Sequence, residues 1–372
     1  MSPSSKNKTN SEPVFKVDES PCATQLSLSE WNDLKALCLI HSTPGDEGEA
    51  ARFMLDAWKN SGWKTSTLGR YAVLAKSPKW IEGRPTVLLC AHLDSPGFIV
   101  QKLIDEHTGI AISLGGPHLT RSHASALVKS GETFHKGKLE SVHNSSLGLK
   151  YPKESDNYFI YAGKTLKRGD RICFMPQCSR FSNGLVKASF LDNRVGCWAL
   201  LQVARKLKNE ATNANVVLAA TAQEEMTGFG ADVLAGQIHA DVTVCLDATY
   251  IDEEQGILFG GGPVLTVCDK STLLCLEVCK SVEDVFARWH LPLQQEYYNY
   301  SGTDSRAFPK QANERPVLAL LLATKGNHSP NETAFEKDIL LYEKMCLDFC
   351  MDDVALQMIV DAWNSWGAVF VR

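Results

Sequence analysis

Two adjacent carboxylates, Glu224 and Glu225, follow directly after a short apolar run, Asn215 to Ala220. Small and β-branched residues make up this run, which predicts a buried strand that delivers both glutamates to its carboxyl-terminal end. Open α/β folds keep their chemistry at that end of their strands. Because like charges repel, a site that uses both glutamates needs a compensating positive charge, and a metal ion is the natural candidate. A glutamate pair alone is more often solvated surface, so the hypothesis depends on the other ligands.

Three further apolar runs predict buried strands that end in residues able to bind a metal. These residues are His92 after 86–91, Asp247 after 242–246 and His328 after 316–324. If the strands form one largely parallel sheet, their carboxyl ends lie side by side and these side chains converge.

Two aspartates extend this set. Asp192 lies at a junction between a β-type segment and a helix expected over Val195 to Leu207. It can cap that helix or direct its carboxylate into the site. Asp94 follows His92 by two residues, so in extended backbone both side chains point the same way. A carboxylate placed there can hydrogen-bond the second ring nitrogen of a histidine ligand and fix its orientation.

The residue types suit a pair of zinc or cobalt ions better than a structural zinc site, because imidazoles and carboxylates are present and thiolates are not. One carboxylate that bridges both ions would leave each ion with an imidazole and a carboxylate of its own. A further carboxylate then remains for acid-base work.

The order of elements predicts an α/β fold with a mixed, largely parallel sheet and helices on both faces. Residues 1–24 are polar and lysine-rich, which predicts a flexible tail. Residues 25–102 and 186–372 are expected to form the main domain. Its first helices should begin near Ser27 and at Gly48.

Between these two segments, residues 103–185 contain only short β-type pieces separated by Gly, Pro, Ser and Asn, which predicts an inserted β-barrel-like domain. Half of the ten histidines lie in this insert, at His107, His118, His123, His135 and His143. We expect exposed loop histidines here; the alternative is that one of them reaches an active site across a subunit contact.

Composition excludes several partners. A net charge of -5 gives no electrostatic reason to expect nucleic acid or a membrane surface. The start, Met1 to Asn10, has no apolar core of signal-peptide length after it, and nowhere do about 18 uncharged apolar residues run together, so we expect a cytoplasmic protein. The twelve cysteines are scattered without metal-type spacing, which indicates buried thiols in a reducing compartment.

Taken together, these motifs resemble the dinuclear metallo-aminopeptidases of the tetrahedral (TET) type, which include glutamyl and deblocking aminopeptidases. The resemblance spans residues from about Ser27 to the C-terminus, insert included. Its motifs are His92-Leu93-Asp94, Phe190-Leu191-Asp192-Asn193-Arg194-Val195-Gly196-Cys197, Gln223-Glu224-Glu225, Asp247, Gly302-Thr303-Asp304 and His328-Ser329-Pro330-Asn331-Glu332.

The resemblance implies a zinc exopeptidase-like fold and a role for each residue. It implies that His92, Asp192, Asp247, Glu225 and His328 bind two divalent ions, with Asp192 bridging. Glu224 would be the general base that deprotonates a metal-activated water, and Asp94 would orient His92. Gly302, Thr303 and Asp304 are candidates for substrate contacts, and the peptide bond after Asp192 is expected to be cis.

The resemblance also implies peptide substrates, an insert that mediates dimerisation, and homo-oligomers that are often dodecameric. Ser95-Pro96 departs from the glutamate that commonly follows in TET-type enzymes, and His92 to Pro96 is similar to the aspartyl aminopeptidases instead. An aspartyl-type aminopeptidase or a related deacylase therefore remains the nearest alternative. A metal-stabilised scaffold would lack ligands or base, and a glycosidase has no use for converging histidines.

Overall fold

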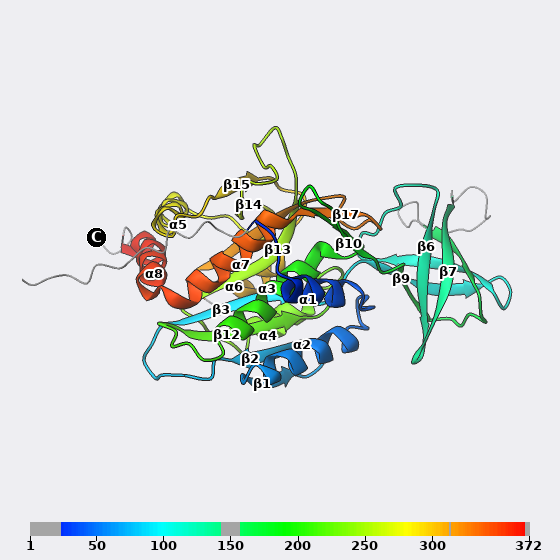
Figure 1. Cartoon of the computed structure of the whole chain (residues 1–372), viewed down its shortest axis with the longest axis horizontal. Helices are drawn as coiled ribbons and strands as arrows, with labels where there is room; N and C mark the ends of the chain where they lie inside the picture. Colours follow the sequence, from blue (N-terminus) through cyan, green and yellow to red (C-terminus); the bar gives the residue numbers. More distant parts are fainter. Residues whose placement is uncertain (1–23, 143–156, 312–313, 369–372) are drawn as a thin grey trace, which may run out of the picture.

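The computed structural model describes residues 24–142, 157–311 and 314–368, which are coloured in Figure 1. Nearly all of the tail expected over 1–24 and one insert histidine, His143, lie outside the described residues. The described chain forms a large sheet covered by helices and a small barrel at one end (Figure 1).

The large sheet is mixed, with four parallel strands at its centre. Its main strand order is β1-β2-β12-β3-β13-β16-β17-β11-β10, and β14 and β15 extend it from β16. The central strands β12, β3, β13 and β16 run parallel, whereas β2 and β17 pair antiparallel at either side. The strands are β1 (Lys64–Leu68), β2 (Ala72–Lys76), β3 (Thr86–His92), β10 (Cys178–Arg180), β11 (Leu185–Ala188), β12 (Asn215–Thr221), β13 (Val242–Tyr250), β14 (Val264–Cys268), β15 (Gln294–Tyr297), β16 (Val317–Lys325) and β17 (Glu332–Phe335).

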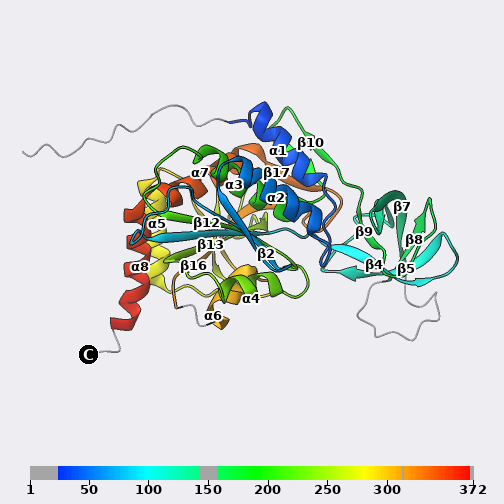
Figure 2. The ribbon, with the colours of Figure 1, turned by 90° about the horizontal axis from the view of Figure 1, so that it is seen from below.

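Helices cover both faces of this sheet, as the sequence predicts (Figure 2). The apolar side chains of α1, α2, α3 and α7 share one core with one face, and α4 and α6 pack on the other. Both faces of the central strands are therefore dry, which is why β12 is buried at every position. The helices are α1 (Leu28–Cys38), α2 (Gly48–Asn60), α3 (Leu191–Lys206), α4 (Phe229–Ala235), α5 (Leu276–Arg288), α6 (Ala307–Lys310), α7 (Glu336–Met351) and α8 (Asp353–Ala368), with a 3-10 turn η2 (Asp304–Arg306).

The first helix begins where its sequence signal places it. Ser27 accepts a hydrogen bond from the backbone N–H of Glu30, and the Glu30 carboxylate accepts one from the backbone N–H of Ser27. This reciprocal cap satisfies two donors that a helix start leaves free. None of the described helices is long and apolar enough to cross a membrane.

The insert is a closed six-stranded barrel with the strand order β4-β5-β8-β7-β6-β9. Phe98, Val128, Leu139, Ile160 and Ile172 fill its interior. The strands are β4 (Gly97–Leu103), β5 (Thr108–Leu114), β6 (His123–Ser130), β7 (Thr133–Val142), β8 (Asn157–Ala162) and β9 (Arg171–Phe174).

The barrel strands occupy a different range from the 103–185 expected for the insert. Strand β4 enters the barrel already at Gly97, while β10 and β11 return to the large sheet. A Cβ at Gly97 would lie 2.6 Å from the carbonyl oxygen of Ile172, so a glycine lets β4 approach β9 closely. Alternating apolar residues mark a strand but do not say which sheet it joins, so the sequence could not place this crossing.

Candidate metal centre and active site

Parallel pairing brings the ends of the central strands together. His92, the last residue of β3, lies opposite Thr221, the last residue of β12. Asp247 is in β13, the other neighbour of β3. Glu225 and His328 follow the ends of β12 and β16 by a few residues. The convergence expected from the sequence is therefore a direct consequence of strand order.

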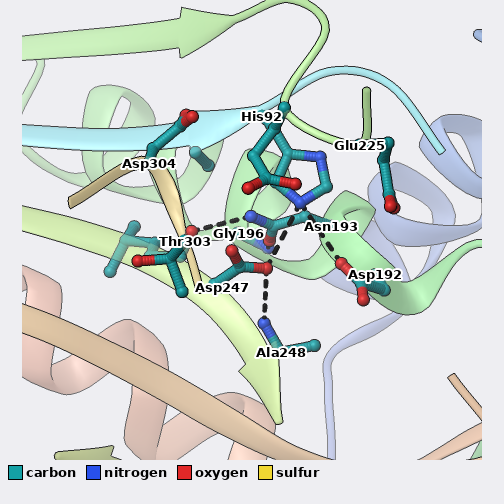
Figure 3. Close-up of polar contacts among 12 residues, drawn as sticks. His92, Asp192, Asn193, Gly196, Glu225, Asp247, Ala248, Thr303 and Asp304 are labelled. Carbon is teal, nitrogen blue, oxygen red and sulfur yellow. Dashed lines mark hydrogen bonds and ion pairs between the residues drawn. The ribbon is translucent and has the colours of Figure 1, made fainter. Parts of the chain in front are cut away.

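Five side chains form two groups that share one carboxylate. In the first group, His92 Nε2 lies 3.2 Å from Asp247 Oδ1 and 3.3 Å from Asp192 Oδ1. In the second, His328 Nε2 lies 3.4 Å from both Asp192 Oδ2 and Glu225 Oε2. In Figure 3 a dashed line joins His92 to Asp192, and Glu225 lies on the same side of His92 as Asp192. Each group could hold one metal ion.

The donor set fits two divalent cations. Asp192 Oδ1 and Glu225 Oε1 are buried, and neither accepts a hydrogen bond from the described residues. Three carboxylates crowded in a buried site need positive charge beside them. The nearby thiol of Cys197 points to the backbone oxygen of His92, so the donors of the two groups are imidazoles and carboxylates. Such a set suits zinc or cobalt.

The electrostatics of the two imidazoles indicate the same demand for positive charge. Burial lowers the pKa of His328, but Glu225 and Asp192 together raise that pKa to about 10. The pKa of His92 is shifted in the same direction, because Asp247 and Asp192 raise it well above the ordinary range of histidine although burial lowers it. Burial also raises the pKa of Glu225 to about 8. Without metal, protons bound to these side chains would have to supply the positive charge that two cations would otherwise supply.

These shifts predict how the stability of the chelated protein depends on pH. Over the window from 6.5, the ordinary pKa of histidine, to about 10, the folded state holds a proton on His328 that the unfolded chain has lost. The stabilisation is complete below pH 6.5 and is lost as the pH rises to about 10, and Glu225 acts in the same direction. Thermal unfolding after chelation should therefore show a Tm that falls across this window more steeply than the Tm of the metal-loaded protein. Equal slopes would contradict the prediction.

Asp192 is held by its backbone and is not a helix cap. The cap position of α3 is Phe190, and Asp192 and Asn193 have non-helical backbone angles where α3 is kinked. The peptide bond between Asp192 and Asn193 is cis, as the resemblance implies. The backbone N–H of Asp192 donates to Glu332 Oε2 at 2.9 Å, which leaves the Asp192 carboxylate free to face both histidines.

His92 contacts Asp94 through the backbone oxygen, whereas the sequence predicted a contact to the carboxylate. His92 Nδ1 lies 3.0 Å from the backbone oxygen of Asp94 but 3.7 Å from its carboxylate. That carboxylate instead accepts the backbone N–H groups of Glu224, at 3.1 Å, and Glu225, at 3.2 Å. Asp94 thus orients His92 through the main chain, and its carboxylate fixes the glutamate pair, a long-range contact that residue spacing cannot reveal.

The two adjacent glutamates face different partners. Glu225 faces His328, whereas Glu224 Oε1 lies 3.1 Å from Arg306 Nη2. Burial raises the pKa of Glu224 well above its usual range, and the Asp247 and Asp304 charges add to the rise while His92 opposes it. Glu224 belongs to neither potential metal group.

A cavity of about 240 Å³ opens over these groups. Gly302 and Thr303 line it, as expected for substrate contacts, but Asp304 does not. Asp304 is buried, and its Oδ2 accepts a hydrogen bond from Thr221 Oγ1 at 2.5 Å. In Figure 3 it lies on the opposite side of His92 from Asp192. Asp304 therefore supports the end of β12 and is not placed to touch a substrate.

Several residues of the cavity wall escaped the sequence analysis. They are Gly116, Met226, Tyr250, Tyr298, Arg306 and Asn327. All except Tyr250, in β13, and Arg306, the last residue of η2, lie in connections between elements, where no periodic pattern marks a functional side chain. Of these residues, Arg306 was the easiest to find from the sequence, because only Ser305 separates it from the motif of residues 302–304.

One insert histidine comes close to the site within the same chain. The backbone N–H of His118 donates to the backbone oxygen of His328 at 3.0 Å, although the His118 side chain itself is exposed. His107 and His123 are exposed as expected. The expectation is wrong for His135, which is buried in β7 with 9% of its surface exposed.

The segment before His118 predicts a sensitive glycine. Gly116 O lies 3.3 Å from His328 Nδ1, and a Cβ at Gly116 would lie 3.2 Å from the same atom. We expect Gly116→Ala to displace His328 and to weaken metal affinity by roughly 10-fold, the lower end for losing such a supporting contact. Metal titration by calorimetry measures this. Gly163→Ala is the matched control in the insert, where the added Cβ meets nothing closer than 3.6 Å. Unchanged affinity in Gly116→Ala would refute the argument.

The chain is similar to known aminopeptidases. The family model for M42 glutamyl aminopeptidase matches residues 162–345. A putative aminopeptidase of Acetivibrio thermocellus is 27% identical over 330 residues, which cover 84% of this chain and 97% of the relative.

Two solved structures share the fold. A TET aminopeptidase from a marine sediment archaeon, Thaumarchaeota archaeon, has a TM-score of 0.78 at 21% identity and covers 89% of this chain and 99% of its own. A Pyrococcus horikoshii TET1 peptidase, described as assembling into a tetrahedron or a large octahedral shell, has a TM-score of 0.74 at 21% identity, with 87% and 99% covered. The chain is an aminopeptidase, and its residues 162–345 match the M42 glutamyl aminopeptidase family.

Proposed function

We propose that this aminopeptidase removes the N-terminal residue of peptides with the help of two divalent ions, zinc or cobalt. His92 and Asp247 would hold one ion, His328 and Glu225 the other, and Asp192 would bridge them. The observation that supports this most directly is the position of Asp192, whose two carboxylate oxygens face the two histidines separately.

Bound together, such ions supply an activated water near neutral pH and polarise a carbonyl group. Glu224 is the proposed general base, since its carboxylate lines the cavity beside both groups without belonging to either. It would take the proton from the attacking water and pass it to the leaving amine. Gly302 and Thr303, on the cavity wall, would contact the peptide.

The proposal is tested with a panel of aminoacyl chromogenic substrates, each assayed with zinc, with cobalt and with a chelator. We expect turnover that depends on added metal and on a free N-terminal amine, with N-acetylated substrates as the control. Inactivity towards every N-terminal residue, with metal bound, would overturn the proposal. Preference for N-terminal aspartate would favour the aspartyl-type alternative.

We also propose that the chain works in the cytoplasm. It would form homo-oligomers through its barrel, from dimers up to a dodecamer. Support comes from the TET1 peptidase of similar fold, which is described as able to assemble into a tetrahedron or a large octahedral shell. Light scattering of the purified protein gives the mass, and a monomer at micromolar concentration would contradict the proposal.

A further inference from the structure

We propose that Arg306 is a positioning residue that holds Glu224 in the orientation in which it can act as a base. The inference rests on the proposed function, because it concerns the base of that reaction. Arg306 stands on the cavity wall, and no other Lys or Arg does so among the described residues.

One nitrogen of Arg306 bridges two parts of the same residue. Arg306 Nη2 lies 3.1 Å from Glu224 Oε1 and 3.1 Å from the Glu224 backbone oxygen. A donor shared between the main chain and the side chain of Glu224 restricts the rotation of the carboxylate, and the contact to the carboxylate is charge-assisted. Because Arg306 contacts Oε1, the second carboxylate oxygen, Oε2, stays available for a proton.

The loop after Glu224 is shaped around this guanidinium. A Cβ at Gly228 would lie 3.0 Å from Arg306 Nη2 and 3.2 Å from its Nε. Gly228 has φ of 70°, a left-handed conformation that glycine adopts without strain. The turn from Gln223 to Gly228 is closed by the N–H of Gly228, which donates to the Gln223 oxygen at 2.8 Å. A glycine at 228 therefore both makes the turn and leaves room for the arginine.

Burial explains why Glu224 needs such a partner. Glu224 belongs to neither group that could hold a metal ion, so no such ion would pair with its carboxylate directly. Only 9% of the Glu224 side chain is exposed, so water cannot replace a missing partner fully. Without Arg306, the carboxylate has one fewer contact that keeps it over the cavity.

The test compares three substitutions at Arg306. For Arg306→Ala we expect kcat to fall roughly 10- to 100-fold, the loss that a misplacement of about 1 Å produces, with KM changed less than about threefold. Both metal ions should remain bound. Arg306→Lys should recover part of kcat because it keeps a donor, whereas Arg306→Met should not. Millimolar guanidinium, well below denaturing concentration, should raise kcat of Arg306→Ala. Arg288→Ala is the matched control, because Arg288 pairs with Asp352 on the outside of the large domain.

A double-mutant cycle shows whether Arg306 acts through Glu224. In the Glu224→Gln background, Arg306→Ala should cause little further loss of kcat, since the base it positions is absent. An equal loss of kcat on Arg306→Ala in both backgrounds would overturn the inference. A rise in KM confined to substrates with an extra carboxylate would also overturn it, because that result would assign Arg306 to substrate binding. If Arg306→Ala does not fold, kcat is compared between Arg306→Lys and Arg306→Met. A fully active Glu224→Gln would instead refute the proposed function, so the two failures are distinguishable.

Discussion

Glu224→Gln should retain both metal ions and lose nearly all peptidase activity. The substitution removes the proposed base and leaves the five proposed ligands in place. Glutamine has nearly the same shape, and its side-chain oxygen can still accept the hydrogen bond from Arg306 that Glu224 accepts at 3.1 Å. We expect kcat to fall by roughly 10²- to 10⁴-fold, the contribution that general base catalysis typically makes.

The adjacent glutamate provides a matched control for this experiment. Glu225→Gln should lose affinity for one ion, because Glu225 Oε2 lies 3.4 Å from His328 Nε2 in the second group. Elemental analysis of both variants, beside kinetics with excess metal, separates base from ligand. Stoichiometric loss of metal in Glu224→Gln, with the ions retained in Glu225→Gln, would reverse the two assignments.

Asp192→Ala should bind at most one ion tightly and should be inactive. The carboxylate of Asp192 is the only one shared by the two groups, with its oxygens 3.3 Å from His92 Nε2 and 3.4 Å from His328 Nε2. Its removal leaves each proposed ion with one histidine and one carboxylate, and takes away the negative charge that offsets repulsion between two dications. Calorimetric titration of chelated protein with zinc gives the number of sites and their affinities.

Asp247→Ala is the control for the bridging role, because Asp247 belongs to the first group alone. We expect that variant to keep the second ion at close to its original affinity, whereas Asp192→Ala should weaken both. Two tightly bound ions in Asp192→Ala would rule out the bridge.

Residue types and spacing determined much of this site. Continuous apolar runs before His92, Glu224 and Asp247 identify strands buried on both faces, and such strands are parallel neighbours in α/β sheets. Their ends must then meet at one edge of the sheet, as Thr221 and His92 do. The apolar pattern of these strands was therefore sufficient to predict that His92, the glutamate pair and Asp247 converge, whereas Asp192 enters from the kinked start of α3.

The sequence left open how the collected side chains are supported. Asp94 binds the backbone of Glu224 and Glu225, which lie 130 residues away or more. Asp304 shares a motif with the cavity residues Gly302 and Thr303 yet turns to Thr221. Hydrogen-bond partners between loops depend on the packed positions of distant elements, which no local pattern encodes.

The sequence by itself thus determined the α/β class, the presence of an inserted β-domain and the identity of the converging residues, because strand and helix periodicity is a local property. Only the tertiary structure decided that β4 belongs to the barrel, that the segment before His118 supports His328, and that Arg306 holds Glu224. Each of these is a contact between segments far apart in the chain, fixed by the register of the sheet and the packing of loops above it.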